Sequence, residues 1–246
     1  KGDRLGPLTK DRAKPAVSFG GKYRIIDFVL SNFVNSGIYS IFVLTQFKAQ
    51  SLMRHLEQGW RLSDLLQDRF VTAVPAQMRT GEEWYKGTSD SVYQNLYLIQ
   101  RHAPKLVAVF GADHIYRMNV GQIIEEHYAK EADVTVAALP VKIEEASQFG
   151  VIEVDNHWRI IGFEEKPTAP KSIPGEPAYA LVSMGNYLFN TDVLMRALKA
   201  DSHNRSSTHD FGHDILPVLV SGQKLYAYDF RKNRIPLPLK SEEPSY

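Results

Sequence analysis

Three residues near the start of the chain have the types and spacing that a polyphosphate site requires. Gly2 is followed by Arg4, and Lys14 stands ten positions later, directly before Pro15. Glycine lets the backbone approach phosphate oxygens and point N–H groups at them, and the two cations neutralise phosphate charge. An ordinary basic tail contains the same residue types, so these residues alone leave both interpretations open.

A carboxylate that could bind a metal follows the apolar run 106–110. Asp113 comes directly after the small residues Gly111 and Ala112. Proteins commonly bind Mg²⁺ through one or two carboxylates, and phosphate oxygens and water complete the metal's shell. An aspartate that caps a helix or stabilises a turn is the more common reason for such a residue. The position therefore indicates that Asp113 is a candidate Mg²⁺ ligand, and a helix-capping or turn-stabilising aspartate is the alternative.

Two further segments combine groups that suit a nucleotide or a sugar phosphate. Residues 85–90, Tyr-Lys-Gly-Thr-Ser-Asp, supply an aromatic ring, a glycine, hydroxyls and a helix start. They suit a base, a ribose or a phosphate, and a simple capped helix is the alternative. Glu165 and Lys166 leave a predicted strand and enter a loop that contains four prolines. This carboxylate can accept bonds from sugar hydroxyls and this lysine can bind phosphate, although a surface ion pair is the commoner arrangement.

Other catalytic motifs do not occur in the sequence. Gly21 and Lys22 superficially suggest a P-loop, but Ala16 replaces its first glycine and Tyr23 replaces the Ser or Thr that binds magnesium. Neither G-x-G-x-x-G nor G-x-S-x-G occurs, which disfavours dinucleotide oxidoreductases and α/β-hydrolases.

Two histidines are spaced as in a metal-binding helix. His209 and His213 are four positions apart, yet no glutamate follows His209, and Phe211 and Gly212 between them predict a turn. We therefore expect two solvent-exposed histidines and no zinc site.

The composition excludes several classes of protein. With 246 residues, of which 43% are hydrophobic, the chain is long enough for one large globular domain. Its 29 basic and 28 acidic residues give a net charge of +1, so no global field attracts nucleic acid or a membrane. The chain has no cysteine, which excludes disulfides, and no apolar run of about 18 residues. We therefore expect a soluble, cytoplasmic protein.

Hydrophobic periodicity alternates between short buried runs and amphipathic stretches. Strands are predicted at residues 41–45, 106–110, 134–139, 150–154, 157–163, 180–189 and 225–230. Helices are predicted at residues 25–33, 46–58, 89–101, 120–130 and 192–199, and irregular segments at 61–81, 166–177 and 201–209. Strands separated by helices of 10–15 residues indicate one α/β domain with a doubly wound, mostly parallel sheet, to which residues 150–163 add a β-hairpin.

Taken in chain order, the motifs resemble those of the sugar-1-phosphate nucleotidyltransferase family. The shared short motifs are G-x-R-L-x-P-L-T at residues 2–9, K-P at 14–15, G-T-x-D at 87–90, F-G-V at 149–151, F-x-E-K-P at 163–167 and S-M-G-x-Y at 183–187. Longer blocks at residues 12–17, 20–28, 45–49, 83–88 and 210–215 are similar to those of its ADP-glucose pyrophosphorylase (glucose-1-phosphate adenylyltransferase) branch. The resemblance extends over essentially the whole chain.

This resemblance implies both a fold and a reaction. The fold is a Rossmann-like mixed sheet, followed in the family by a left-handed parallel β-helix that residues 1–246 lack. In the reaction, the phosphate of glucose 1-phosphate attacks the α-phosphorus of ATP, and ADP-glucose and pyrophosphate form in the committed step of bacterial glycogen synthesis. The attacking phosphate is already anionic, so catalysis consists of positioning and charge neutralisation with Mg²⁺. A homotetramer regulated by small-molecule effectors is also implied.

The functional residues of the family are carried over onto the matching positions of this chain. Arg4 and Lys14 match cations that hold the triphosphate and the reacting phosphates, and Asp113 matches a Mg²⁺ ligand. The positions for glucose 1-phosphate are Tyr85, Gly150, Glu165, Lys166 and Ser183. The nucleotide-binding positions are Gly2, Arg4, Gly87, Thr88 and Asp90, and the regulatory positions are Gln46, Trp84, Arg12 and Arg24.

Some residues depart from the family pattern and keep two alternatives open. Asp3 places a negative charge in the phosphate loop, and Asp11 replaces an activator-binding lysine of some relatives. Asp3 keeps open a catalytically silent regulatory subunit. A relative that forms another NDP-sugar is the other alternative, because the specificity for adenine is implied by the resemblance of the longer blocks alone. The chain begins within the phosphate loop and ends before a family block that supplies a second metal aspartate. We expect residues 1–246 to be a catalytic domain that is incomplete at both ends and inactive when made alone.

Overall fold

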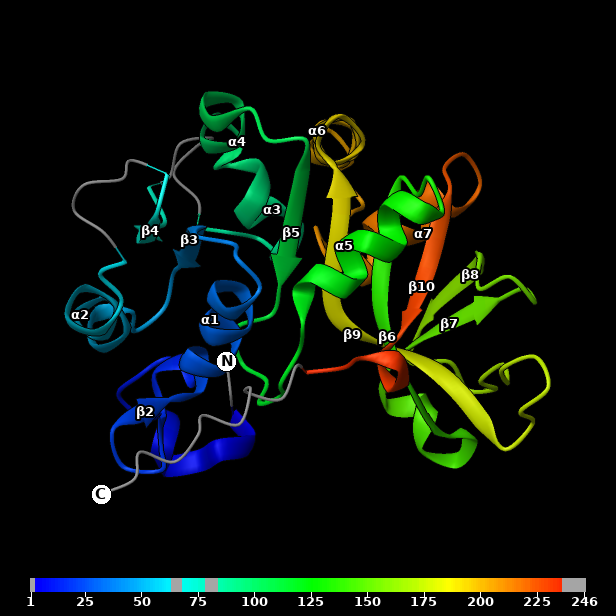
Figure 1. Ribbon diagram of the computed structural model, residues 1–246, viewed down its shortest axis with the longest axis horizontal. Helices are drawn as coiled ribbons and strands as arrows, with labels where there is room; N and C mark the ends of the chain where they lie inside the picture. Colours follow the sequence, from blue (N-terminus) through cyan, green and yellow to red (C-terminus); the bar gives the residue numbers. More distant parts are fainter. Residues whose placement is uncertain (1–2, 63–67, 78–83, 236–246) are drawn as a thin grey trace, which may run out of the picture.

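The computed structural model describes residues 3–62, 68–77 and 84–235, and it contains a large mixed sheet together with two smaller ones (Figure 1). The six strands of the large sheet are β5 (Leu106–Phe110), β6 (Val134–Lys142), β7 (Gly150–Val154), β8 (Ile160–Glu165), β9 (Tyr179–Asn190) and β10 (Leu225–Asp229). The smaller sheets are β1 (Ser18–Phe19) with β2 (Tyr23–Arg24), and β3 (Ser40–Thr45) with β4 (Phe70–Pro75).

Strand β9 is the element on which the large sheet is assembled. It pairs antiparallel with β5, β6 and β7, whereas β10 runs parallel to β6 and β8 runs antiparallel to β7. The prediction of an α/β fold with a mixed sheet is confirmed. The ladders are nevertheless more antiparallel than the pattern predicts, because β9 is reached through the β7–β8 hairpin and a loop rather than through a crossover helix.

A bulge interrupts β9 next to the carboxyl end of β5. The ladder with β6 shifts between Ala137 and Ala138, whose partners in β9 are Asn186 and Ser183, so two residues of β9 are left over. The second of them, Gly185, has φ of +70°, which glycine adopts without strain. Because bulges change the direction of nearby side chains, this bulge decides how Ser183 is presented at the end of the neighbouring strand.

Helices cover both faces of the large sheet (Figure 1). Within the described residues they are α1 (Ile25–Asn35), α2 (Gln50–Gly59), α3 (Thr88–Tyr93), α4 (Leu96–His102), α5 (Val120–Ala129), α6 (Thr191–Ser202) and α7 (Leu216–Val220), with the helical turns η1 (Asp3–Thr9), η2 (Lys14–Ala16), η3 (Ile143–Gln148), η4 (Phe211–Ile215) and η5 (Phe230–Lys232). Side chains of β6 alternate between the faces: Val136 packs in the core with α6, and Ala137 packs in the core with α5. None of the described helices is long and apolar enough to cross a bilayer.

Most of the predicted elements are confirmed, and those at residues 46–58, 61–81 and 89–101 are among the ones that differ. Residues 46–49 form a turn in which Lys48 has φ of +49°, so α2 begins at Gln50 rather than at Gln46. The segment 61–81, predicted to be irregular, contains the short strand β4, which lies parallel to β3. The helix predicted at 89–101 is divided into α3 and α4, because the side chain of Asn95 donates to Ser91 O and replaces a backbone donor there.

The turn predicted around Phe211 and Gly212 is also different in the structure. These residues form the π-helical turn η4, which continues directly into α7. The carboxylate of Asp210 accepts the backbone N–H groups of Gly212 and His213 and so begins the helical turn. Sequence periodicity over so few residues carries no clear signal for such a turn.

Candidate active site

The structure brings Lys14 and Asp113 into contact, although 99 residues separate them in the chain. Lys14 begins the turn η2, and Asp113 lies just beyond the carboxyl end of β5. Lys14 Nζ donates a 2.8 Å hydrogen bond to Asp113 Oδ2, and the two side chains are 31% and 39% exposed. This central ion pair, Lys14 with Asp113, therefore combines a cation and a carboxylate that both remain accessible to a ligand.

The surroundings of Asp113 keep its carboxyl group ionised. Burial raises the pKa of Asp113, but the Lys14 hydrogen bond and the positive charges of His114 and Lys14 outweigh that effect and hold the pKa below its ordinary value. The Nε2 atom of His114 lies 3.6 Å from Asp113 Oδ1. At neutral pH the site thus presents a carboxylate that is available to a hard cation.

The bulge in β9 places Ser183 beside the turn that carries Asp113. Gly111 N donates to Gly185 O at 3.2 Å, and Gly185 N donates to Ser183 Oγ at 3.1 Å. The hydroxyl of Tyr187 is hydrogen-bonded to Ser183, and burial of Tyr187 raises the pKa of its phenol to about 12. The hydroxyl of the predicted sugar-phosphate residue Ser183 is therefore held by Gly185 N and by the neutral phenol of Tyr187.

A second group of predicted site residues meets where β7 begins and β8 ends. Gly150 and Glu165 are direct partners in the β7–β8 ladder, and Lys166 Nζ donates to Glu165 Oε1 at 2.6 Å. A Cβ atom at Gly150 would lie 2.8 Å from both Glu165 Oε2 and Phe163 Cζ, so a side chain at this position would displace the glutamate. Lys166 has φ of +48°, which ends the strand and turns the chain into the proline-rich loop.

Four residues near this second group, Tyr187, Asp210, His213 and Asp214, were not predicted as site residues. The phenol of Tyr187 lies in the field of both Glu165 and Asp210. His213 is exposed, and its hydrogen bond to Asp214, together with the charges of Asp210 and Glu165, raises its pKa above the ordinary value. The sequence blocks S-M-G-x-Y and D-F-G-H-D contain all four residues, so the motifs include them, but the motifs alone do not indicate a role for them.

The prediction that His209 is solvent-exposed is wrong. His209 is 9% exposed, and its Nδ1 atom lies 2.8 Å from the buried carboxylate of Asp201. Asp201 also accepts hydrogen bonds from Ser89 and Ser207. This carboxylate, which lies in α6, organises the polar loop at residues 201–209.

Residues 84–87 lead into α3, which begins at Thr88, and most of the nucleotide-binding groups predicted in residues 84–90 are engaged within the protein. Asp90 accepts from Lys86 N and from Gln94 Nε2, and the hydroxyl of Thr88 donates to Asp210. Tyr85, the predicted sugar-phosphate residue in this segment, is hydrogen-bonded through its hydroxyl to Asn95, and burial raises its pKa.

Gly87 lies against the backbone of another segment. A Cβ atom at Gly87 would lie 2.2 Å from His209 O and 2.5 Å from Thr208 O. The packing of residues 208–209 therefore explains the glycine by itself.

Comparison with known proteins gives a consistent result. The model of the family described as nucleotidyl transferase matches residues 1–234. The chain belongs to the nucleotidyl transferase family. The resemblance seen in the sequence motifs is thereby confirmed.

Curated relatives of this nucleotidyl transferase carry one activity in their names. The chain is 57% identical over 241 residues to the glucose-1-phosphate adenylyltransferase of Thermus thermophilus. It is 54% identical over 235 residues to the glucose-1-phosphate adenylyltransferase 1 of Vibrio cholerae, and 53% identical over 237 residues to the glucose-1-phosphate adenylyltransferase of an Anaeromyxobacter species. Each alignment covers 96% of this chain but only 57–58% of the relative. The chain therefore spans less than two thirds of the length of these relatives.

The N-terminal site positions of this nucleotidyl transferase are described in part. Gly2 lies outside the described residues, and the backbone of Arg4 lies in η1, whereas its side chain is outside the description. Of the predicted regulatory residues, Arg12 is exposed, as is Trp84. Arg24 points inward and donates to Ala16 O, and Gln46 Nε2 makes a long 3.4 Å contact with Tyr85 O.

The donors present at the central ion pair fit a metal that is shared with phosphate. Among the described residues, no three His, Asp or Glu side chains form a cluster that could enclose an ion. Asp113 offers a single ionised carboxylate, which matches the way Mg²⁺ binds through one or two carboxylates and substrate phosphates. The ionised carboxylate of Asp113 therefore fits a divalent metal.

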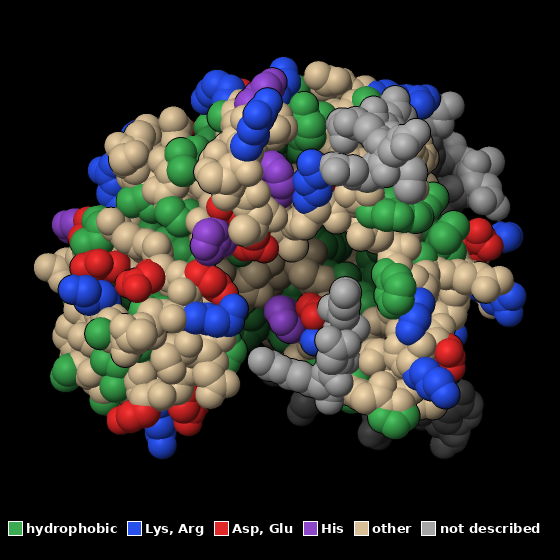
Figure 2. Space-filling model, turned by 180° about the vertical axis from the view of Figure 1, so that it is seen from behind, with side chains coloured by type: hydrophobic (Ala, Val, Ile, Leu, Met, Phe, Trp, Pro, Cys, Tyr) green, Lys and Arg blue, Asp and Glu red, His purple; other side chains and the backbone are tan. Residues whose placement is uncertain are grey.

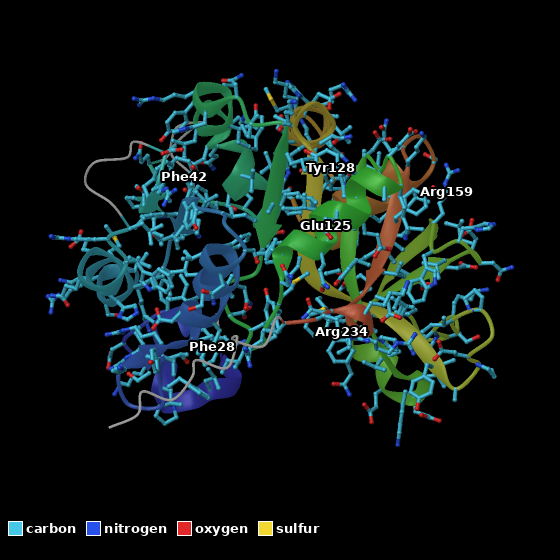
Figure 3. All side chains as sticks on the ribbon, viewed as in Figure 1. Phe28, Phe42, Glu125, Tyr128, Arg159 and Arg234 are labelled. Carbon is cyan, nitrogen blue, oxygen red and sulfur yellow. The ribbon has the colours of Figure 1, made fainter. Side chains whose placement is uncertain are left out.

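The face seen in Figure 2 is hollowed near its centre, and basic, acidic and histidine side chains gather in the hollow. A separate groove of about 310 Å³ lies at α5 and is lined by Gln122, Glu125, Glu126, Ala129, Tyr228 and Lys232. Figure 3 shows Glu125 and its neighbour Tyr128 on α5, on the opposite side of the molecule from the view of Figure 2. None of the predicted site residues lines this groove, so we place the candidate active site at the central ion pair.

Proposed function

We propose that this chain catalyses transfer of the adenylyl group from ATP to glucose 1-phosphate, with release of pyrophosphate and formation of ADP-glucose. The observation that carries the proposal is the central ion pair, held at the end of β5 beside the Ser183 bulge. It supplies a cation for phosphate and a carboxylate for a divalent metal in one place. The names of the relatives support adenylyl transfer to glucose 1-phosphate over transfer of another nucleotidyl group.

The reaction requires positioning and charge neutralisation rather than a general base. A phosphate oxygen of glucose 1-phosphate forms a bond to the α-phosphorus of ATP, and the bond from that phosphorus to the bridging oxygen breaks. Pyrophosphate leaves with the electron pair of the broken bond. Because the attacking oxygen is already negatively charged at neutral pH, no side chain has to remove a proton.

We assign the residues of the central ion pair to the nucleotide phosphates. Lys14, with Arg4, neutralises charge on the triphosphate, and Asp113 holds the divalent metal, which we take to be Mg²⁺. When bound there, the metal would supply positive charge that offsets the negative charge of the phosphate oxygens. Gly87, Thr88 and Asp90 are assigned to the nucleotide side with Gly2.

The second group of residues is assigned to the sugar phosphate. Lys166 binds its phosphate, and Glu165, which already lies 2.6 Å from Lys166 Nζ, accepts bonds from the sugar hydroxyls. The absence of a side chain at Gly150 leaves the Glu165 carboxylate in place. Ser183 and Tyr85 complete the predicted contacts. A role in bacterial glycogen synthesis, homotetramer formation and regulation by small molecules at Arg12, Arg24, Gln46 and Trp84 are further parts of this proposal.

The test is release of pyrophosphate by the full-length protein supplied with ATP, glucose 1-phosphate and Mg²⁺. We expect ADP-glucose as the second product and little competition from UTP, dTTP or GTP. Turnover with one of these nucleotides instead would identify a relative that makes another NDP-sugar. Effector binding without pyrophosphate release would identify a silent regulatory subunit and refute the proposal.

A further inference from the structure

The start of helix α1 is bound to the turn that carries Lys14. The guanidinium of Arg24, the residue before α1, donates through Nη1 to Ala16 O at 2.6 Å. Ala16 is the last residue of η2 and is fully buried. Ile25 N donates to Val17 O at 3.1 Å, so two hydrogen bonds join α1 to the end of this turn.

Near its other end, α1 is bound to the loop between β5 and α5, which carries Asp113. Asn32 is 6% exposed, and its Nδ2 donates to Tyr116 O at 3.1 Å. Its Oδ1 accepts from Met118 N at 2.9 Å. The loop has no regular secondary structure between Asp113 and α5, so the asparagine supplies hydrogen bonds that a sheet or helix would otherwise provide.

Helix α1 is itself held firmly. Its Asp27 accepts from Arg24 N at 2.8 Å, from His55 Nε2 at 2.6 Å and from Trp60 Nε1 at 2.8 Å, and this fixes the first turn to α2. At a rise of about 1.5 Å per residue, the eight residues from Arg24 to Asn32 span roughly 12 Å. Such a short, buried helix has one length, so its two anchored ends keep a fixed separation.

Packing alone would favour a different residue at position 32. Asn32 lies in a buried stretch of α1 beside Leu30 and Phe33, which pack in the core. Burying an amide in such a place is costly unless its polar atoms are satisfied, and here both the donor and the acceptor are used on the Asp113 loop.

We propose that Arg24 and Asn32 are positioning residues, and that they use α1 as a rigid spacer to set the distance between Lys14 and Asp113. Arg24 acts through Ala16, and Asn32 acts through Tyr116 and Met118. Neither side chain has to touch a substrate. The inference rests on the proposed function, because it gives the central ion pair the task of binding a metal and a nucleotide together.

The test compares Asn32→Ala with Asn35→Ala in the full-length protein. Asn35 lies on the same helix but is exposed, which makes it a matched control. We expect Asn32→Ala to weaken Mn²⁺ binding, measured with ATP present by electron paramagnetic resonance of the free ion, by about tenfold. Amide hydrogen exchange should accelerate in residues 111–119. The kcat should fall, whereas the KM for glucose 1-phosphate should stay within about twofold of wild type.

Arg24→Ala tests the other end of the helix and serves if Asn32→Ala does not fold. Because Arg24 is only half-buried, we expect a folded variant with weakened Mn²⁺–ATP binding and an unchanged KM for glucose 1-phosphate. The inference would be overturned if both folded variants bound Mn²⁺ as wild type does. It would also be overturned if the variants lost affinity for ATP and for glucose 1-phosphate equally.

Failure of the proposed function would look different. If the wild-type protein released no pyrophosphate, the adenylyl-transfer proposal would fail, while Mn²⁺ binding and hydrogen exchange would still report whether α1 positions the Asp113 loop. If the wild-type protein were active and both variants matched Asn35→Ala in every readout, only the positioning inference would fail.

Discussion

Replacing Gly87 with alanine separates a packing role of this glycine from a ligand-binding role. The backbone at Gly87 is extended, with φ of −162°, so alanine has no conformational cost there. The added Cβ would nevertheless lie 2.2 Å from His209 O and 2.5 Å from Thr208 O. Both atoms belong to backbone, which cannot rotate away, so the start of α3 and residues 208–209 must move apart.

The size of the effect follows from the contacts that would be lost. Overpacking of this kind typically costs about 1–3 kcal/mol. The movement would also weaken two hydrogen bonds, Ser89 N to His209 O at 2.8 Å and Phe211 N to the Thr88 hydroxyl at 3.1 Å. With each bond contributing about 1 kcal/mol, we expect a total destabilisation of about 3–5 kcal/mol. At roughly 2–4 °C per kcal/mol, the thermal midpoint should fall by about 6–20 °C.

The assay is thermal unfolding of the full-length variant, with Gly222→Ala as the control. Gly222 is exposed, and no heavy atom would lie within 4 Å of its added Cβ, so this control should stay within about 0.5 kcal/mol of wild type. If Gly87→Ala had the same midpoint as the control but a raised KM for ATP, the packing explanation would be refuted and the glycine would be needed for close approach of the nucleotide.

Three other perturbations have defined outcomes. Lys166→Ala should raise the KM for glucose 1-phosphate far more than the KM for ATP, because a phosphate contact disappears at one substrate; steady-state kinetics showing equal effects would remove Lys166 from the sugar-phosphate site. Asp113→Asn should abolish turnover and leave the circular dichroism spectrum unchanged, and near-normal Mg²⁺-dependent activity would exclude a metal-binding role for this residue. Burial lowers the pKa of His127, whose ring lies between Thr135 and Asn190. Below about pH 6.5 the unfolded chain therefore binds a proton at His127 that the folded chain does not bind, so the free energy of unfolding should fall from pH 7 to pH 5. The fall should be larger in wild type than in His127→Gln, and urea titrations at the two pH values would measure it.

The elements that sequence periodicity predicted best are those with one clear apolar side. Helices α1, α5 and α6 and the β7–β8 hairpin lie close to the predicted ranges, because burial of one face is the dominant force on such segments. Strand β4 was missed, since six residues without a following helix give a weak pattern. The direction of β9 was missed as well, because strand direction depends on the connection rather than on the strand's own residues.

The residue types of the candidate site could be predicted from the sequence, but the residues that hold the site in position could not. Motifs pointed to Lys14 and Asp113, and the structure places them in contact. Nothing in the sequence indicated that Asn32 bonds a loop more than 80 positions away. The same holds for His209, which the pattern placed in solvent and which Asp201 holds in the interior. These polar residues lie in helices or loops whose local pattern is satisfied without them, and only the tertiary fold supplies their partners.

The bulge in β9 has a consequence for which changes this chain can tolerate over evolution. Residues 186–189 pair with β5 on one side and with β6 on the other, so one inserted or deleted residue there would shift two ladders at once. A shift by one residue turns every following side chain to the opposite face of a sheet. Selection should therefore remove insertions and deletions from this strand, whereas substitutions that keep the alternation of side chains between the two faces of the sheet survive. Length variation among descendants should accumulate in the loops on either side of the strand.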